Sequence, residues 1–519
     1  MADTTMPAIY KLPDELLLQI TEHLRAREAS NELQHLRKLC RVSKKLLPIA
    51  QEQLVAGAIL HITCGCHPNV SAAVLLLRTL LDRPDLASKV KALRFSIVRR
   101  KIGALYKSKG FDLRKLREKC LAKLVEFNYD EGHPWWASLQ NDLESAYGGV
   151  LLAILPNLDK LDFAAKDHHR GFPTVEPTSA FFGTSTAPDA TVKALAKVEN
   201  FIAADLSFLR DMAFTNLKIM DIKRIDIGTV LRLNGPNTLR GATQLEDLSL
   251  GVSIQFLDED YLKDMQVCLG DVFAALGCTK LRRLDIMLGN DAYSLGAERD
   301  FCPDYLIKQF DVVASTLCEL EIDLDHHEEG EEWSWFLNQC MKPITSLDKF
   351  PVLQRLKIPQ EFLFIHPRHG PAIFPSNLPR SLQRLDIVAP DQNIVTWAGQ
   401  FTTCKILDLP GFRTLCLQCR EGLNRSKVEF SKNVSRVWST LEMRLGIKSL
   451  VCDNADGEET SLTALYDGDP ANRATDSDND SDDDGEGWGD EDEDCDDDNV
   501  PPLMDVEVSE EELLVDGVD

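Results

Sequence analysis

The sequence predicts an α/β protein with three parts: a small helical unit, a long body of stacked strand-and-helix repeats, and an acidic segment that does not fold. Three observations indicate this organisation. Apolar residues recur at helical spacing before residue 57, an apolar-x-x-apolar-x-apolar pattern recurs between residues 90 and 409, and periodicity stops after Cys452. A chain of 519 residues has room for several domains.

The formal net charge of −26 comes almost entirely from one end of the chain. Residues 453–519 hold 28 Asp and Glu side chains and a single basic one, Arg473. The preceding residues are therefore close to neutral. The net charge gives no reason to expect an acidic binding face on the folded part.

Three short amphipathic helices are predicted between residues 12 and 56. Pro13 suits the first turn of a helix because its missing N–H costs nothing there, and Asp14 meets the positive end of the helix dipole. Ser43 can cap the third helix. A unit this small lacks a sufficient core of its own, so the rest of the chain or another protein must complete its apolar stripes. The apolar positions of the three helices are Leu16, Leu17, Ile20 and Leu24, then Leu33, Leu36, Leu39 and Cys40, then Leu46, Leu47, Ala50 and Leu54.

The motif Leu-Pro-x-Glu-Leu at residues 12–16, followed by Ile20, Leu24 and the run Leu-Cys-Arg-Val-Ser-Lys-Lys-Leu at 39–46, resembles an F-box. The alternative is a helical cap that only covers the next domain. The two interpretations differ in whether the apolar stripes of the helices face another protein.

The F-box resemblance covers residues 12–56 and implies docking onto the Skp adaptor of a cullin-RING ubiquitin ligase. It departs from the family at Leu46 and Leu47, where many members place tryptophan or phenylalanine. The matching positions implied to bind the adaptor are Leu12, Pro13, Leu16, Leu17, Ile20, Leu39, Val42 and Leu46.

The body of the chain carries nine copies of the apolar-x-x-apolar-x-apolar pattern, each predicting a strand. Central positions 248, 284, 320 and 356 are 36 residues apart, and the next two steps are 29 and 22. Between the strands, residues 262–276 and the segment from Pro303 are predicted helices. Such units bury their apolar faces only by stacking on neighbours. The nine copies are Val90/Leu93/Phe95, Leu158/Leu161/Phe163, Leu217/Met220/Ile222, Leu245/Leu248/Leu250, Leu281/Leu284/Ile286, Leu317/Leu320/Ile322, Leu353/Leu356/Ile358, Leu382/Leu385/Ile387 and Cys404/Leu407/Leu409.

Residues 57–452 resemble an irregular leucine-rich-repeat solenoid of parallel strands and helices, of the kind found behind many F-boxes, particularly in fungal proteins. The asparagine that the family places three residues after the last apolar strand position is missing. Other residues stand there, namely Ser253, Gly289, Asp325, Glu361 and Pro390. The turns must therefore be held by other hydrogen bonds.

The residues that flank each central apolar position point away from the core, because side chains alternate along a strand. We expect them to form a ladder that faces a protein substrate, although charge here also serves a solvated surface. Acids are dense between Asp221 and Glu321 and bases between Arg355 and Arg384, which favours a partner of split charge. The substrate-facing candidates are Arg94, Lys160, Asp162, Asp221, Asp247, Ser249, Arg283, Asp285, Glu319, Glu321, Arg355, Lys357, Arg384, Asp386 and Asp408.

A helical insertion is predicted near residues 99–149, where the first two recognised strands are far apart. Residues 99–123 hold ten Lys or Arg against Asp112 and Glu118. Such a cluster suits an acidic protein segment, in this chain or another, or it is a solvated face. Few aromatic residues lie among these cations to stack on bases, which argues against binding to nucleic acid.

Common catalytic templates are absent from the sequence: there is no Walker motif, Gly-x-Gly-x-x-Gly, Gly-x-Ser-x-Gly or His-Glu-x-x-His. We therefore expect a non-catalytic protein with no cofactor and no metal. The pairs His168/His169 and His326/His327 fit surface histidines better than a site. The groups Cys64/Cys66/His67 and Cys416/Cys419 fit buried thiols better than zinc ligands.

No run approaches the roughly 18 apolar residues of a membrane span, and residues 1–11 lack the features of a secretory signal. We expect an intracellular protein, in the cytoplasm or the nucleus. Residues 453–519 should be disordered, because their composition cannot bury enough apolar area to offset the entropy of ordering. The expected function is that of a substrate receptor in a Skp-cullin-F-box ubiquitin ligase. The alternative is a scaffold outside the ligase.

Overall fold

The structure is a computed structural model that describes residues 12–26, 33–42, 44–60, 70–167, 177–203, 214–225, 230, 244–289, 301–324, 342–363, 377–391, 393–402, 409–419, 437–453 and 459–463. The chain divides into two units, Met1–Gly468 and Asp469–Asp519, and every described residue belongs to the first. The prediction of disorder for residues 453–519 is wrong at the start of the segment, where Asp453 ends one strand and Glu459–Ser461 form another. Residues 454–458 and 464–519 lie outside the described residues.

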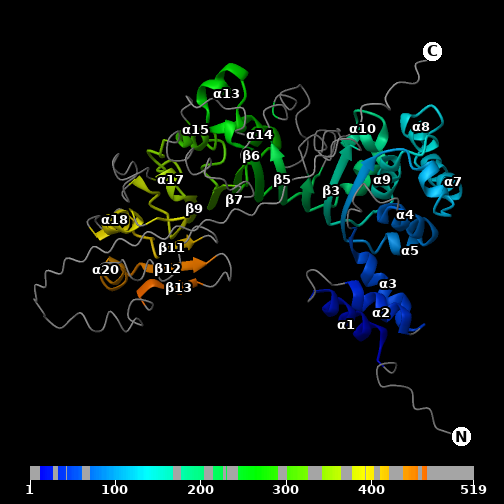
Figure 1. Cartoon of the computed structure of the whole chain (residues 1–519), viewed down its shortest axis with the longest axis horizontal. Coiled ribbons are helices and arrows are strands. Elements are labelled where there is room, and N and C mark those ends of the chain that lie inside the picture. Colours follow the sequence, from blue (N-terminus) through cyan, green and yellow to red (C-terminus); the bar gives the residue numbers. More distant parts are fainter. Residues whose placement is uncertain are drawn as a thin grey trace, which may run out of the picture. The chain divides into compact units, whose positions relative to one another are not determined.

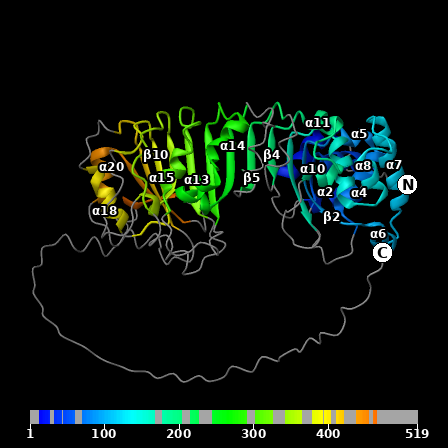
Figure 2. The ribbon, with the colours of Figure 1, turned by 90° about the horizontal axis from the view of Figure 1, so that it is seen from above.

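In the described part of the chain, thirteen strands form one sheet in which spatial order follows chain order from β1 to β13 (Figures 1 and 2). Neighbouring strands are parallel throughout, apart from the antiparallel final pair β12 and β13. This confirms the predicted α/β class with a mainly parallel sheet. The strands are β1 (Gly57–Ile59), β2 (Ala92–Arg99), β3 (Lys160–Asp167), β4 (Asn200–Ala203), β5 (Ile219–Ile225), β6 (Asp247–Ser253), β7 (Arg283–Gly289), β8 (Glu319–Leu324), β9 (Arg355–Pro359), β10 (Arg384–Val388), β11 (Thr414–Cys419), β12 (Lys448–Asp453) and β13 (Glu459–Ser461).

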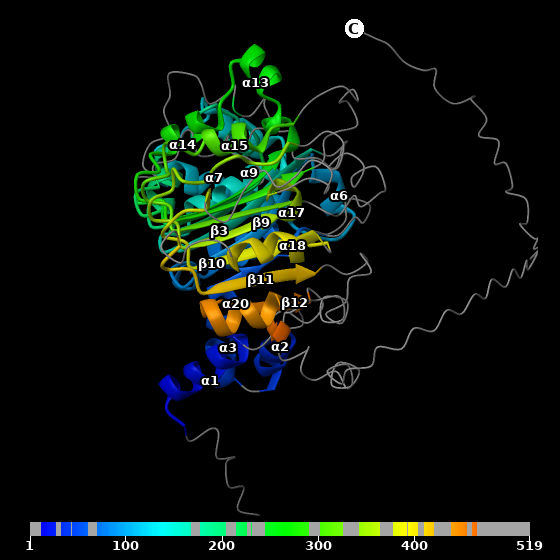
Figure 3. The same ribbon diagram turned by 90° about the vertical axis from the view of Figure 1, so that its left-hand side faces the viewer.

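The central apolar positions of the repeats align across the sheet into one buried column. Leu248 pairs with Leu284, which pairs with Leu320, and Leu356 and Leu385 follow in the same register. All five side chains are buried. Each strand therefore completes the core of the next one, as the 36-residue spacing predicts. Figure 3 shows the later strands β9, β10 and β11 one above another.

The ninth predicted strand is wrong. Leu409 lies in the turn before β11, and its carbonyl accepts a hydrogen bond from the Phe412 N–H. Cys404 and Leu407 lie outside the described residues. The strand is instead formed by Thr414–Cys419, and Leu415 takes the column position beside Leu385.

Helices cover the apolar face of the first strands (Figure 1). Phe181 of α10 lies 6.2 Å from Phe95 of β2 and 5.5 Å from Phe163 of β3, measured between ring centroids. Gly149 of α9 makes the close packing of α10 possible, because a Cβ there would lie 2.9 Å from the Phe181 carbonyl oxygen. The helices are α1 (Asp14–Ala26), α2 (Leu33–Val42), α3 (Leu46–Ala56), α4 (Ala72–Asp82), α5 (Pro84–Ala87), α6 (Gly103–Lys107), α7 (Leu113–Glu126), α8 (Pro134–Gln140), α9 (Glu144–Ala153), α10 (Pro177–Phe182), α11 (Asp189–Leu195), α13 (Glu259–Met265), α14 (Leu269–Leu276), α15 (Pro303–Lys308), α17 (Gln360–Leu363), α18 (Asn393–Gly399) and α20 (Val437–Leu445), with 3₁₀ turns η3 (Ile254–Leu257) and η6 (Gln400–Thr402).

Backbone hydrogen bonds hold the entries to the strands from β3 to β11. The Lys91 carbonyl accepts from the N–H groups of Asp159 and Lys160, at 2.8 and 3.0 Å. The same two-donor pattern continues along the sheet at the carbonyls of Asp159, Glu199, Lys218, Glu246, Arg282, Cys318, Gln354 and Gln383. These bonds give the backbone N–H groups at the strand entries their partners, and Asn157 and Asn216 add side-chain hydrogen bonds to the carbonyls of Ser88 and Ala196 in two of the turns.

The first three helices have a small core of their own, formed by Leu17, Leu46 and Ile49. Helix α3 runs directly into β1, so the helical trio is joined to the sheet without a linker. Within the described ranges, no helix is both long enough and apolar enough to cross a membrane.

We predict that Leu284→Ala lowers the free energy of unfolding by about 2–5 kcal/mol, because it removes a fully buried side chain from the apolar column. Met287→Ala is the matched control, since Met287 belongs to the same strand but is exposed. Its effect should stay within about 0.5 kcal/mol. Urea denaturation followed by circular dichroism measures the free energy of unfolding of both variants. Equal losses of this free energy would contradict the assigned register.

Candidate protein-recognition surfaces

An apolar stripe on α1 faces away from the core of the helical trio. Pro13, Leu16 and Ile20 follow one another at helical spacing. Leu16 is 44% exposed and Ile20 is 42% exposed, whereas Leu17 between them is buried. We call Pro13, Leu16 and Ile20 the α1 stripe. Uncovered aliphatic side chains in one row are typical of a surface that another protein covers.

The structure divides the remaining predicted adaptor-binding residues. Leu17 and Leu46 are only 1% and 4% exposed and form the trio's own core, so their prediction as adaptor contacts is corrected. Leu12 and Leu39 are half-buried against that core. The side chain of Val42 lies outside the described residues.

The sheet presents a second surface, opposite the apolar column, which we call the polar face. Side chains immediately before and after each column position form its first and second rows. The first row runs Gly57, Ala92, Lys160, Asn200, Ile219, Asp247, Arg283, Glu319, Arg355, Arg384, Thr414 and Lys448. The second row runs Ile59, Arg94, Asp162, Ile202, Asp221, Ser249, Asp285, Glu321, Lys357, Asp386, Cys416 and Leu450.

The register thus places the predicted ladder residues side by side, except Asp408, which lies outside the described residues. The sequence prediction missed the positions supplied by β1 and β4, such as Ile59 and Ile202. These strands are short, and their copies of the repeat pattern, Val55/Ala58/Leu60 and Val198/Phe201/Ala203, each place the small residue alanine at one apolar position.

The basic part of the ladder is neutralised within the sheet. Asp386 is 0% exposed, so its prediction as a substrate-facing residue is corrected. Its carboxylate lies 2.9 Å from Arg355 Nε and 2.7 Å from Arg384 Nη2, and Arg384 also pairs with Glu459 of β13 at 2.6 Å. The hydrogen bond to Asp386, with that to Glu459, raises the pKa of Arg384 despite its burial. The two arginines therefore stabilise the sheet through ion pairs within it.

An ion-pair network continues on β7 to β9. Lys357 Nζ lies between Glu321 and Asp323, 3.1 Å from the Asp323 carboxylate, and Arg283 reaches Glu321 at 3.7 Å. Burial lowers the pKa of Lys357, but the hydrogen bond to Glu321 and attraction by both acids outweigh it, so the pKa is raised overall. Lys357 is thus held in its charged form.

Asp285 stands at the centre of the acidic part. Burial, with repulsion from Glu321 second, raises its pKa from 3.8 to about 6. Ser249 Oγ donates a long hydrogen bond of 3.5 Å to Oδ2, and buried Oδ1 has no hydrogen-bond partner within the described ranges. Burial likewise raises the pKa of neighbouring Asp247. This stretch of the face remains acid-rich.

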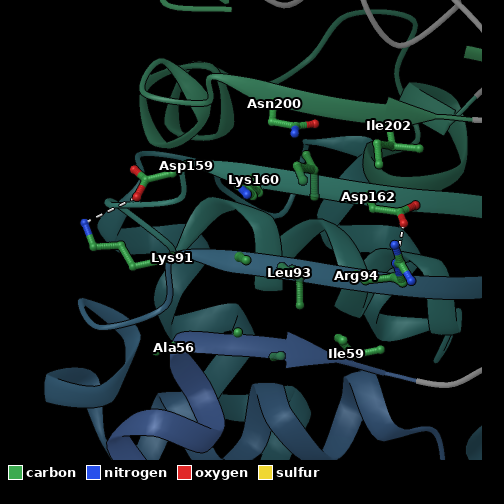
Figure 4. Close-up of a pocket in the computed structure, with 14 residues that line it drawn as sticks. Ala56, Ile59, Lys91, Leu93, Arg94, Asp159, Lys160, Asp162, Asn200 and Ile202 are labelled. Carbon is green, nitrogen blue, oxygen red and sulfur yellow. Dashed lines mark hydrogen bonds and ion pairs between the residues drawn. The ribbon is translucent and has the colours of Figure 1, made fainter. Parts of the chain in front are cut away.

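A pocket of about 390 Å³ opens on the polar face over β1 to β4 (Figure 4). Its lining includes Gly57, Ile59 and Ala92 from the first two strands, and Lys160 and Ile202 from the next two. Charged residues, which include Arg94, Asp162 and Lys160, stand here among small and aliphatic ones. They carry no periodic signal of their own, so the sequence did not reveal the pocket.

The predicted helical insertion is present as α6 to α9, but many of its cations are paired. Arg100 forms a buried pair with Glu144 at 2.6 Å, and Arg117 pairs with Asp142 at 2.9 Å. Further pairs join Lys119 to Asp82, Lys123 to Glu126 and Arg114 to Glu118. The insertion therefore presents a weaker basic face than its composition predicts.

The candidate metal ligands do not form a site where the structure describes them. Cys416 and Cys419 are three residues apart on β11 and point to opposite faces of the sheet. Both thiols are buried, and burial, with repulsion from Asp386 second, raises the pKa of Cys416. No group of three or more His, Cys, Asp or Glu in the described ranges is placed to hold a metal ion. The groups at 64–67, 168–169 and 326–327 lie outside those ranges.

A scan against models of known protein families finds no match, and a search of curated proteins finds no relative.

We predict a pH-dependent effect for Asp285→Asn. Because the pKa is raised on folding, the folded state keeps a proton between pH 3.8 and about 6 that the unfolded state has lost. This contribution to stability is present at low pH and disappears as pH rises through 6. The stability of the variant, relative to the parent, should therefore be greater at pH 7.5 than at pH 4.5.

Urea denaturation at both pH values measures this difference. Met287→Ala, on the same strand, removes no ionisable group and should shift stability equally at both. If the stability difference between Asp285→Asn and the parent were the same at both pH values, it would contradict the raised pKa of Asp285.

Proposed function

We propose that this chain is the substrate-receptor subunit of a Skp-cullin-F-box ubiquitin ligase. In this role, the helical trio docks the Skp adaptor and the sheet binds a protein substrate. The observation that carries the proposal is the α1 stripe, an exposed apolar row on a unit whose motif at residues 12–16 resembles an F-box.

The size of the stripe suits an adaptor interface. Full burial of a large aliphatic side chain contributes about 1.5–3 kcal/mol, and Leu16 and Ile20 still have 44% and 42% of their surface to bury. Two such anchors, with Pro13 and the half-buried Leu12 and Leu39 at their margin, supply the apolar centre on which a stable interface depends. Leu17 and Leu46 hold the three helices together beneath it.

The register of the sheet supports a binding role for the polar face. Parallel strands bring the side chains of many repeats into two continuous rows, which gives an extended surface to a partner. The conjugating enzyme of the ligase performs the amide-bond chemistry. This chain raises the effective concentration of substrate beside it.

We predict that Leu16→Ala combined with Ile20→Ala weakens binding to the Skp adaptor by roughly tenfold or more, since burial of the exposed 44% and 42% of the two side chains contributes about 1–3 kcal/mol in all. Met443→Ala is the matched control, because Met443 is 79% exposed on α20, far along the chain. Titration of purified adaptor measures affinity, and circular dichroism checks that the variants fold. Unchanged affinity of the double variant would contradict the proposal.

A scaffold outside the ligase is distinguished by the fate of its partners. In the ligase role, a protein that co-purifies with this chain should have a longer half-life in cells that lack the chain. Re-expression of the double variant in those cells should not restore rapid turnover. An unchanged half-life, measured by pulse-chase, would favour the scaffold.

A further inference from the structure

We propose that the pocket over β1 to β4 binds an extended segment of a partner protein, taking up one large apolar side chain while Lys160 binds a neighbouring carboxylate of the same segment. This inference rests on the part of the proposed function that gives the polar face to a protein partner. It does not depend on adaptor binding.

The hollow exists because small residues occupy the first row at one end of the sheet. Gly57 pairs with Ala92, and Ala92 pairs with Lys160. Further along the same row stand long side chains such as Arg283 and Arg355. A first row without side-chain bulk on two adjacent strands leaves space above the sheet.

The lining of this space is largely apolar. Ile59 lies on β1 in the second row, and Ile202 lies on β4 in the same row, one on each side of the pocket (Figure 4). Exposed Ile219 follows in the first row on β5. These side chains gain by contact with an apolar group that displaces water.

The charges around the pocket leave one cation unpaired. Lys91 pairs with Asp159 at 3.7 Å, and Arg94 pairs with Asp162 at 2.5 Å. Both pairs are drawn in Figure 4, with Lys160 between them. The exposed Lys160 side chain makes no ion pair or hydrogen bond within the part of the chain that the structure describes. The pocket therefore complements an apolar group with one negative charge beside it.

The volume limits the size of the apolar group. Pockets for whole small ligands are about 300–1,000 Å³, so about 390 Å³ takes one leucine- or phenylalanine-sized side chain with its flanking backbone. The segment can continue across the strands over Ile219, since the first row is unbroken from β1 to β12. An acid next to the anchor then reaches Lys160.

The probe is a positional-scanning library of immobilised nine-residue peptides, each with one fixed residue, incubated with the purified full chain alone. We expect selection of Leu, Ile, Met or Phe at one position and of Asp or Glu within two positions of it.

Two variants of the full chain test each half of the pocket. Ala92→Leu should fill the hollow and reduce binding of the selected peptide roughly tenfold or more, because burial of a large side chain is lost. Lys160→Glu should replace the selection of acids by selection of Lys or Arg. Lys448→Glu is the matched control, since Lys448 is exposed in the same row on β12 and should leave the selection unchanged.

Several results would overturn the inference. One is that the intact chain selects no residue at any position of the peptides, and another is that its preferences stay the same in both pocket variants. A third is that Lys448→Glu changes the preferences as much as the pocket variants do. Self-association abolished by Lys160→Glu would assign the pocket to a second copy, and peptide binding that appears only after removal of residues 464–519 would assign it to the chain's own acidic segment. If adaptor affinity alone fails its test, the ligase role falls while this inference stands.

Discussion

The continuous parallel register of the apolar column is the constraint on which the rest of the structure depends. Once Leu248, Leu284 and Leu320 pair with one another in the core, alternation fixes the side chains on the opposite face. The acid-rich stretch around Asp285, the neutralised arginines beside Asp386 and the pocket at the first strands all follow from this register. A slip of one residue would bury the charges and expose the leucines.

The sheet and the helical trio both carry apolar side chains that must be shielded from water, and they shield them in different ways. The sheet covers its apolar face with helices, as Phe181 of α10 shows against Phe95 and Phe163. The helical trio is too small to bury every apolar side chain it carries. Leu17 and Leu46 fill its core, and Leu16 is left outside. An incomplete core on one surface and an ordered polar face on another suit a protein that joins two partners.

Much of the fold was predictable because the repeat carries a strong local signal. The pattern places Leu248 and Leu356 in the column without any knowledge of the pairing. It failed at Leu409, where a leucine before the Pro-Gly turn imitates the pattern and the strand begins five residues later, at Thr414. It also missed β4, whose copy of the pattern ends on the small residue Ala203, although Phe201 lies in the core column beside Leu161.

The recognition surfaces were less predictable, because burial depends on neighbours that are distant in sequence. The alternation rule places Asp386 on the outward face, but only pairing brings Arg355 beside it and removes it from solvent. On α1, Leu16 and Leu17 look equivalent in the sequence, and only the packing of Leu46 decides which one is covered. The pocket needs the small residues Gly57 and Ala92 on adjacent strands, which no linear motif records.

The proposed division between an adaptor-binding trio and a partner-binding sheet is tested most directly by hydrogen–deuterium exchange of the intact chain with and without the Skp adaptor. We expect the adaptor to slow exchange in residues 14–26 and to leave exchange in β2 to β10 unchanged. Slower exchange in β2 to β4, with none in residues 14–26, would contradict this division.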